Sequence, residues 1–191
     1  MKTLVPLLSL IPTFLLGQVD FYDQLADSAE TLAFDEVSYD PGYYSIEYPN
    51  GDVPEGKGVC TDVVIRAYRK FGIDLQKEVH EDMSANFGHY PNHWGLTTTD
   101  KNIDHRRVPN LMKYFERHGK MLPISSEPED YLPGDIVCWN LGGATTHIGI
   151  VTNEPSNDGK TLKVVHNIGA GQVIEDMLFD YRIIGHYRYR Q

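Results

Sequence analysis

Apolar residues recur at helical spacing through the first two thirds of the chain. Phe21, Leu25, Ala29 and Leu32 lie three or four positions apart, which places them on one face of a helix. Three further stretches repeat this spacing, and glycine, proline and asparagine turn signals fall between them. The pattern predicts four helices, at about 20–33, 60–71, 75–86 and 107–118.

The last third of the chain changes to short runs rich in β-branched and aromatic residues. Turn-forming sequences such as Pro133-Gly134-Asp135 and Asn157-Asp158-Gly159 separate these runs. They predict strands at about 136–139, 147–151, 162–166 and 182–189. Helices first and an antiparallel meander second predict an α+β fold. A length of 191 residues suits one domain.

The first 17 residues differ from the rest. A short basic start precedes an apolar run from Leu4 to Gly17, which is too short to span a bilayer and is typical of a secretory signal. Cleavage could follow residue 17 or residue 26, and a buried N-terminal helix is the alternative interpretation. No cysteine follows the run to carry a lipid. We therefore expect residues 18–191 to form one soluble domain, periplasmic or secreted, without a stable membrane anchor.

Charge narrows the possible partners. The formal net charge is −10, and polyanions such as nucleic acid require a basic surface that this chain lacks, so we expect no nucleic acid partner. His89 and His93 have the spacing of metal ligands on a helix, but Pro91 between them argues against a helix there. We expect neither a metal nor another cofactor, and a monomeric protein.

The two cysteines, Cys60 and Cys138, admit two interpretations. In an exported chain they could form a disulfide. Cys60, however, follows the glycine-rich Gly56-Lys57-Gly58 and opens the second predicted helix. A helix N-terminus lowers the pKa of a thiol by offering unpaired N–H groups and the positive end of a dipole. This position favours Cys60 as a nucleophile that reacts as a thiolate.

Two of the eight histidines are candidates for its base. His147 opens a predicted strand after the Gly142-Gly143-Ala144 loop, and His166 lies on the next strand. Side chains facing each other across neighbouring strands are about 5 Å apart, so one imidazole could orient the other. Alternatively, each is a strand histidine without a chemical role. Together with Cys60 they would supply nucleophile, base and orienter.

Several of these segments resemble a known superfamily. Gly58-Val59-Cys60 opening a helix, followed by segments 133–137, 147–151 and 164–166, looks like the NlpC-type peptidoglycan endopeptidases. Segments 59–67, 104–111 and 165–169 closely resemble one bacterial branch, family 1287 of the domains of unknown function. The resemblance extends over roughly residues 25–190.

The resemblance implies a papain-like (NlpC-type) fold, in which the helix carrying the cysteine packs on an antiparallel sheet. It also implies an exported cysteine hydrolase, a peptidase or amidase, with Cys60, His147 and His166 as its catalytic residues. Tyr48 would help to polarise the substrate carbonyl, with Tyr43 and Tyr44 as competing choices. The substrate implied is an amide bond in a peptidoglycan stem peptide, cleaved through an acyl-enzyme.

Recognition of that substrate is less defined. Arg106 and Arg107 could bind a stem-peptide carboxylate, or they could belong to a helix start with Asp104 as N-cap and Pro109 in the first turn. Typical members read Asp-Cys-Ser-Gly where this chain reads Val59-Cys60-Thr61-Asp62, so the contacts beside the thiol differ. A peptide-binding module without turnover, and an acyltransferase or thioesterase, stay open as alternatives.

Overall fold

The structure, a computed structural model, describes residues 20–190. The predicted export signal in residues 1–17 lies outside the described residues. The second candidate cleavage point, after Ala26, lies inside the first helix, where Leu25 and Ala26 are fully buried. None of the helices formed by the described residues has the length and apolar character needed to cross a membrane.

Four α-helices form where the apolar periodicity predicts them. They are α1 (Phe21–Leu32), α2 (Cys60–Arg69), α3 (Leu75–Ala85) and α4 (Val108–His118); three short 3-10 helices, η1 (Phe87–His89), η2 (Asp104–Arg106) and η3 (Pro128–Asp130), lie in the connections. The side chains of Asp20 and Asp74 accept hydrogen bonds from the first free N–H groups of α1 and α3. In α1 and α3 the capping residue therefore lies at the helix start that the apolar spacing predicts.

The start of α4 differs in one respect from the prediction. Pro109 lies in the first turn as expected, but the N-cap position belongs to Arg107 and not to Asp104. Asp104 begins η2 instead, and its buried carboxylate accepts the backbone N–H of Asp100 at 2.6 Å. The N-cap assignment was wrong because an extra 3-10 turn precedes the helix.

The strands form one six-stranded antiparallel sheet in the order β3-β8-β4-β5-β6-β7. They are β3 (Lys120–Met121), β4 (Ile136–Gly142), β5 (Thr145–Pro155), β6 (Leu162–Asn167), β7 (Gln172–Glu175) and β8 (Arg182–Arg188). A separate parallel pair joins β1 (Ser38–Tyr39) to β2 (Lys57–Gly58). The predicted α+β class is confirmed, whereas β3 and β7 were not predicted because such short strands carry little periodicity.

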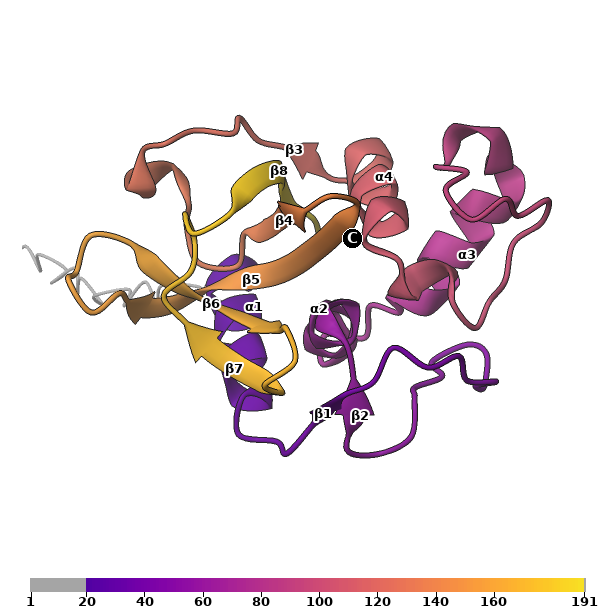
Figure 1. The fold of residues 1–191 in the computed structure, drawn as a ribbon, viewed down its shortest axis with the longest axis horizontal. Helices are drawn as coiled ribbons and strands as arrows, with labels where there is room; N and C mark the ends of the chain where they lie inside the picture. The colour runs from indigo at the N-terminus through magenta and orange to yellow at the C-terminus, as the bar shows by residue number, and fades with distance from the viewer. Residues whose placement is uncertain (1–19, 191) are drawn as a thin grey trace, which may run out of the picture.

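Side-chain alternation along the sheet builds two cores. Cys138, Ile148 and Ile150 face α1, α2 and α4 and share the main core with them. Val137 and Trp139 point to the opposite face, where the chain after β7 covers a smaller core. Figure 1 shows α2 at the centre of the molecule, between the sheet on one side and α3 on the other.

One buried ion pair links the segments around the start of α2. Arg106 donates from Nε to Asp62 at 3.0 Å, and both side chains are almost completely buried. The same guanidinium donates to the backbone carbonyls of Asp40 and Gly42 at 3.2 and 2.9 Å. Because these residues come from the β1 loop, α2 and η2, a single side chain holds three distant segments together.

Removal of this cation should destabilise the fold. We expect Arg106→Met to lower the free energy of unfolding by about 3–5 kcal/mol, because it leaves the Asp62 carboxylate buried without its partner. Urea denaturation followed by circular dichroism measures the change. As a control, Lys160→Met removes the exposed pair with Asp158 and should cost less than about 1 kcal/mol. Equal effects of the two substitutions would contradict this role of Arg106.

Candidate active site

The start of α2 presents Cys60 to the sheet. The chain leaves β2 at Gly58 and turns into the helix at Val59, whose N–H donates to the Asp62 carboxylate at 2.7 Å. Cys60 is then the first helical residue, and its side chain is buried at the edge of the main core. Local sequence, a glycine followed by an acidic residue at the third helical position, accounts for this placement.

The thiol of Cys60 lies against β5, at the backbone of Ile148, the residue after His147. The backbone N–H of Ile148 interacts with the thiol, as do the N–H groups of Cys60 and Thr61 in the first helical turn. These N–H groups favour the thiolate, but burial outweighs them and raises the pKa of Cys60 to about 12. The expected lowering of this pKa by the helix N-terminus was wrong for the free protein, because a buried thiol loses the hydration that a thiolate needs.

His147 begins a chain of polar contacts that runs across three strands. Its Nε2 lies 3.1 Å from Nδ1 of His166 on β6, and Nε2 of His166 lies 3.1 Å from the Glu175 carboxylate on β7. A carboxylate only accepts, so His166 donates from Nε2, and its Nδ1 then accepts from Nε2 of His147. This order leaves Nδ1 of His147 without a proton and able to act as a base.

Gly149 allows these strands to approach closely enough for the contact. A Cβ at this position would lie 2.8 Å from the carbonyl oxygen of Val165 and 3.2 Å from Cβ of His166. His147 and Gly149 share one face of β5, so the missing side chain leaves room beside His166. The His147-x-Gly149 spacing thus has a structural cause.

Burial keeps the two imidazoles neutral. It lowers the pKa of His147 to about 3, with His166 as a lesser cause, and it lowers the pKa of His166 against the opposing effect of Glu175. Within residues 20–190, no hydrogen bond joins the Cys60 thiol to the His147 ring. The free protein therefore holds a neutral Cys60 thiol and a neutral His147 imidazole that His166 orients.

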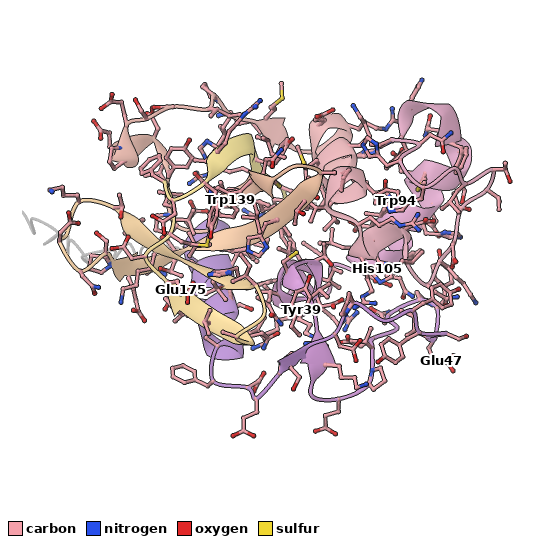
Figure 2. All side chains as sticks on the ribbon, viewed as in Figure 1. Tyr39, Glu47, Trp94, His105, Trp139 and Glu175 are labelled. Atoms are coloured by element: carbon pink, nitrogen blue, oxygen red, sulfur yellow. The ribbon has the colours of Figure 1, made fainter. Side chains whose placement is uncertain are left out.

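Cys60 opens into a pocket of about 190 Å³. Tyr39 from β1, Trp94, Arg107 and Thr146, the residue before His147, contribute to its lining. Burial, and to a lesser extent Cys60, raise the pKa of Tyr39, and both residues line this pocket. Figure 2 shows Tyr39 next to α2 and Trp94 between α3 and α4.

Tyr48 lies elsewhere. Its ring contacts His80 on α3, with ring centroids 5.3 Å apart, and the ammonium of Lys101 lies over the same ring. It does not contribute to the lining of the Cys60 pocket. Of the tyrosines in the loop before α2, Tyr39 is therefore the one that the fold brings to the thiol.

The two predicted arginines have different surroundings. The guanidinium of Arg106 is occupied by Asp62 and two backbone carbonyls, although it borders the Cys60 pocket. The guanidinium of Arg107 lies over the ring of Trp94, 4.2 Å from its centroid. Its Nη1 is buried and has no hydrogen-bond partner among the described residues.

Two residues of the site, Glu175 and Tyr39, were not predicted from the sequence. Glu175 lies on the unpredicted strand β7, diagonally across from His166, whose direct partner is Val173. The sequence signal for this strand was the two-residue spacing of Val173 and Glu175 after a glycine turn. Tyr39 had no signal that separated it from the other tyrosines of the same loop.

The other residues considered for chemistry are Cys138, His89 and His93. Cys60 and Cys138 are both free thiols, so the disulfide interpretation is wrong. Nδ1 of His89 contacts Arg117, and the ring of His93 packs on Trp94. The described residues contain no cluster of three or more His, Cys, Asp or Glu side chains arranged to hold a metal ion.

Alkylation tests the state of the thiol. Because the pKa of Cys60 is about 12, we expect its reaction with iodoacetamide to accelerate about tenfold per pH unit from pH 7 to 10 without a plateau. In urea the same rate should level off above about pH 8.5, the unperturbed value for cysteine. Mass spectrometry measures both rates, and Cys60→Ala reports the contribution of Cys138. A plateau below pH 7 in the folded protein would contradict a raised pKa.

Comparison with known proteins agrees with the resemblance to family 1287. The chain matches the family described as Domain of unknown function (DUF1287) over residues 26–189. It is similar to Uncharacterized protein YijF from Escherichia coli (strain K12), at 51% identity over 178 residues that cover 93% of this chain and 86% of that protein. No solved structure gave a match. The chain therefore belongs to the DUF1287 family of domains of unknown function.

Proposed function

We propose that the protein is a cysteine hydrolase that cleaves an amide bond in cell-wall stem peptides. The observation that carries this proposal is the position of the Cys60 thiol, at the start of α2, against the Ile148 N–H of β5, next in the chain to His147, whose imidazole is oriented through His166. A nucleophile, a base and a group that fixes the base are the parts that acyl transfer requires. A helix start packed on an antiparallel sheet is also the arrangement of the NlpC-type, papain-like enzymes that the sequence resembles.

In the proposed reaction, substrate binding brings the base to the thiol. Catalytic contacts often tighten only in the substrate complex, so the present lack of a hydrogen bond is compatible with this role. The thiol proton passes to Nδ1 of His147 while Sγ attacks the amide carbonyl carbon, and the carbonyl π electrons move to oxygen. Formation of the thiolate during attack avoids a charged, buried thiolate in the free enzyme.

The tetrahedral intermediate requires donors for its negative oxygen. The N–H of Cys60 is one donor at the helix start, and the Tyr39 hydroxyl is better placed than Tyr48 to supply another. Collapse of the intermediate breaks the C–N bond, and the imidazolium of His147 gives its proton to the leaving amine. Water, deprotonated by His147, then attacks the thioester; the C–S bond breaks and the proton returns to sulfur.

The cell wall as substrate and the exported location rest on sequence. The resemblance to peptidoglycan endopeptidases supplies the substrate class, and the apolar run in residues 1–17 supplies a route of export to the periplasm or medium. The alternative function is a module that binds the same peptide in the Cys60 pocket without cleaving it. Turnover separates the two.

Purified muropeptides provide the direct test. We expect the wild-type protein to release a shorter peptide product, detected by mass spectrometry, and Cys60→Ala to release none while still binding. Since Cys60 is the proposed nucleophile, activity should fall by at least about 10³-fold. Binding by both forms without cleavage by either would overturn the hydrolase proposal in favour of the binding module.

The role of His166 has its own test. His166→Ala removes the acceptor of the His147 Nε2 proton, and we expect kcat to fall by up to about 10²–10⁴-fold, the range that general acid–base catalysis supplies. His166→Asn keeps an accepting oxygen and should restore part of the rate. Circular dichroism checks that both variants fold. Equal rates for the Ala and Asn variants would remove His166 from the mechanism.

A further inference from the structure

A second pocket continues from the one that contains Cys60. It has a volume of about 260 Å³ and lies against α3 and the chain that follows it. Trp94 and Arg107 belong to the lining of both pockets and form the boundary between them. Met83, Phe87 and Tyr90 make the far wall largely apolar. The two pockets adjoin at these two residues and are together called the groove, and Cys60 lines one of them.

Arg107 is a cation without an anion in this groove. Among the described residues, its guanidinium has neither an ion pair nor a hydrogen bond, and Nη1 is buried without a partner. Burial lowers the pKa of Arg107, which shows that its surroundings do not compensate fully for lost hydration. Asp104 and Asp100 act in the opposite direction but do not contact it. A buried donor left unpaired in this way is unfavourable until a ligand supplies an acceptor.

The stacking on Trp94 explains how the side chain is held in place. The guanidinium lies 4.2 Å from the centre of the indole ring, which fixes its plane while leaving its edge free for hydrogen bonds. The neighbouring Arg106 provides the contrast, because Asp62, Asp40 and Gly42 already accept its hydrogen bonds. Arginine presents paired N–H groups that match the two oxygens of a carboxylate.

We propose that Arg107 and Trp94 form a subsite for a substrate carboxylate, which selects peptides carrying a free carboxylate close to the scissile amide. This inference rests on the proposed function and specifies its substrate. The substrate carboxylate binds the free edge of the Arg107 guanidinium. The aliphatic part of the peptide residue that carries this carboxylate packs on Trp94 and on the apolar wall of the second pocket. The Cys60 pocket, which shares both residues, then holds the amide to be cleaved.

Matched muropeptides test the subsite through binding and through turnover. Two amidated forms, one at the terminal carboxylate and one at a side-chain carboxylate, are compared with the free acid. Calorimetry on the Cys60→Ala protein should show binding that weakens about 10- to 100-fold when the recognised carboxylate is amidated, the effect of losing a charge-assisted hydrogen bond. The amidated form that binds weakly identifies which carboxylate is read.

Variants assign the preference to Arg107. In the Cys60→Ala background, Arg107→Gln should bind free and amidated peptides equally well. Lys101→Gln removes a nearby cation that lies over Tyr48 and outside the groove lining, and it should keep the full preference. If the Cys60→Ala protein with Arg107 intact binds free and amidated peptides equally, or binds neither, the subsite is overturned.

Turnover separates this inference from the proposed function. If the protein with Cys60 intact cleaves the free-acid peptide 10- to 100-fold faster than the amidated one, and Arg107→Gln cleaves both at one rate, both proposals are supported. Cleavage of all forms at one rate by the wild-type protein keeps the hydrolase and overturns the subsite. No cleavage, with a carboxylate preference in binding that depends on Arg107, overturns the hydrolase and supports the subsite.

Discussion

The buried ion pair between Asp62 and Arg106 is the contact on which the site depends. Asp62 caps the N–H of Val59, so it fixes where α2 begins, and Arg106 neutralises the buried carboxylate while holding the carbonyls of Asp40 and Gly42. Through this one network the β1 loop, α2 and the segment before α4 keep their relative positions. Charges buried this deeply are tolerated only when almost every donor and acceptor is satisfied.

The network also separates the roles of two adjacent arginines. Arg106 points inward and completes the scaffold, which positions the next residue, Arg107, at the boundary of the groove. The network gives a structural reason for one departure from the Asp-Cys-Ser-Gly pattern, the aspartate at position 62. The residue two positions after Cys60 is an acidic cap that needs a cation, and η2 supplies it.

Desolvation dominates the electrostatics around Cys60. The helix start and the Ile148 N–H favour a thiolate, yet the thiol is buried deeply enough for its pKa to rise to about 12, and the pKa of His147 falls to about 3. Both shifts favour the uncharged pair. A raised pKa slows oxidation and alkylation of this thiol, since reactivity follows the thiolate.

Local sequence patterns specify the secondary-structure elements and part of the chemistry. Four helices and four strands follow from apolar periodicity, because each element buries one face and the local spacing records it. The position of Cys60 at a helix start and the pairing of His147 with His166 follow from the same local patterns, since neighbouring strands of a meander pair in sequence.

Which side chains meet across long separations in the chain depends on how the elements pack together. Nothing local distinguishes Tyr39 from Tyr48, or Arg106 from Arg107, because their roles depend on packing against residues far away in the chain. The contact of Glu175 with His166 depends on β7, a strand too short to predict from the sequence. The pKa of Cys60 likewise depends on burial, which the whole fold sets and a helix position does not.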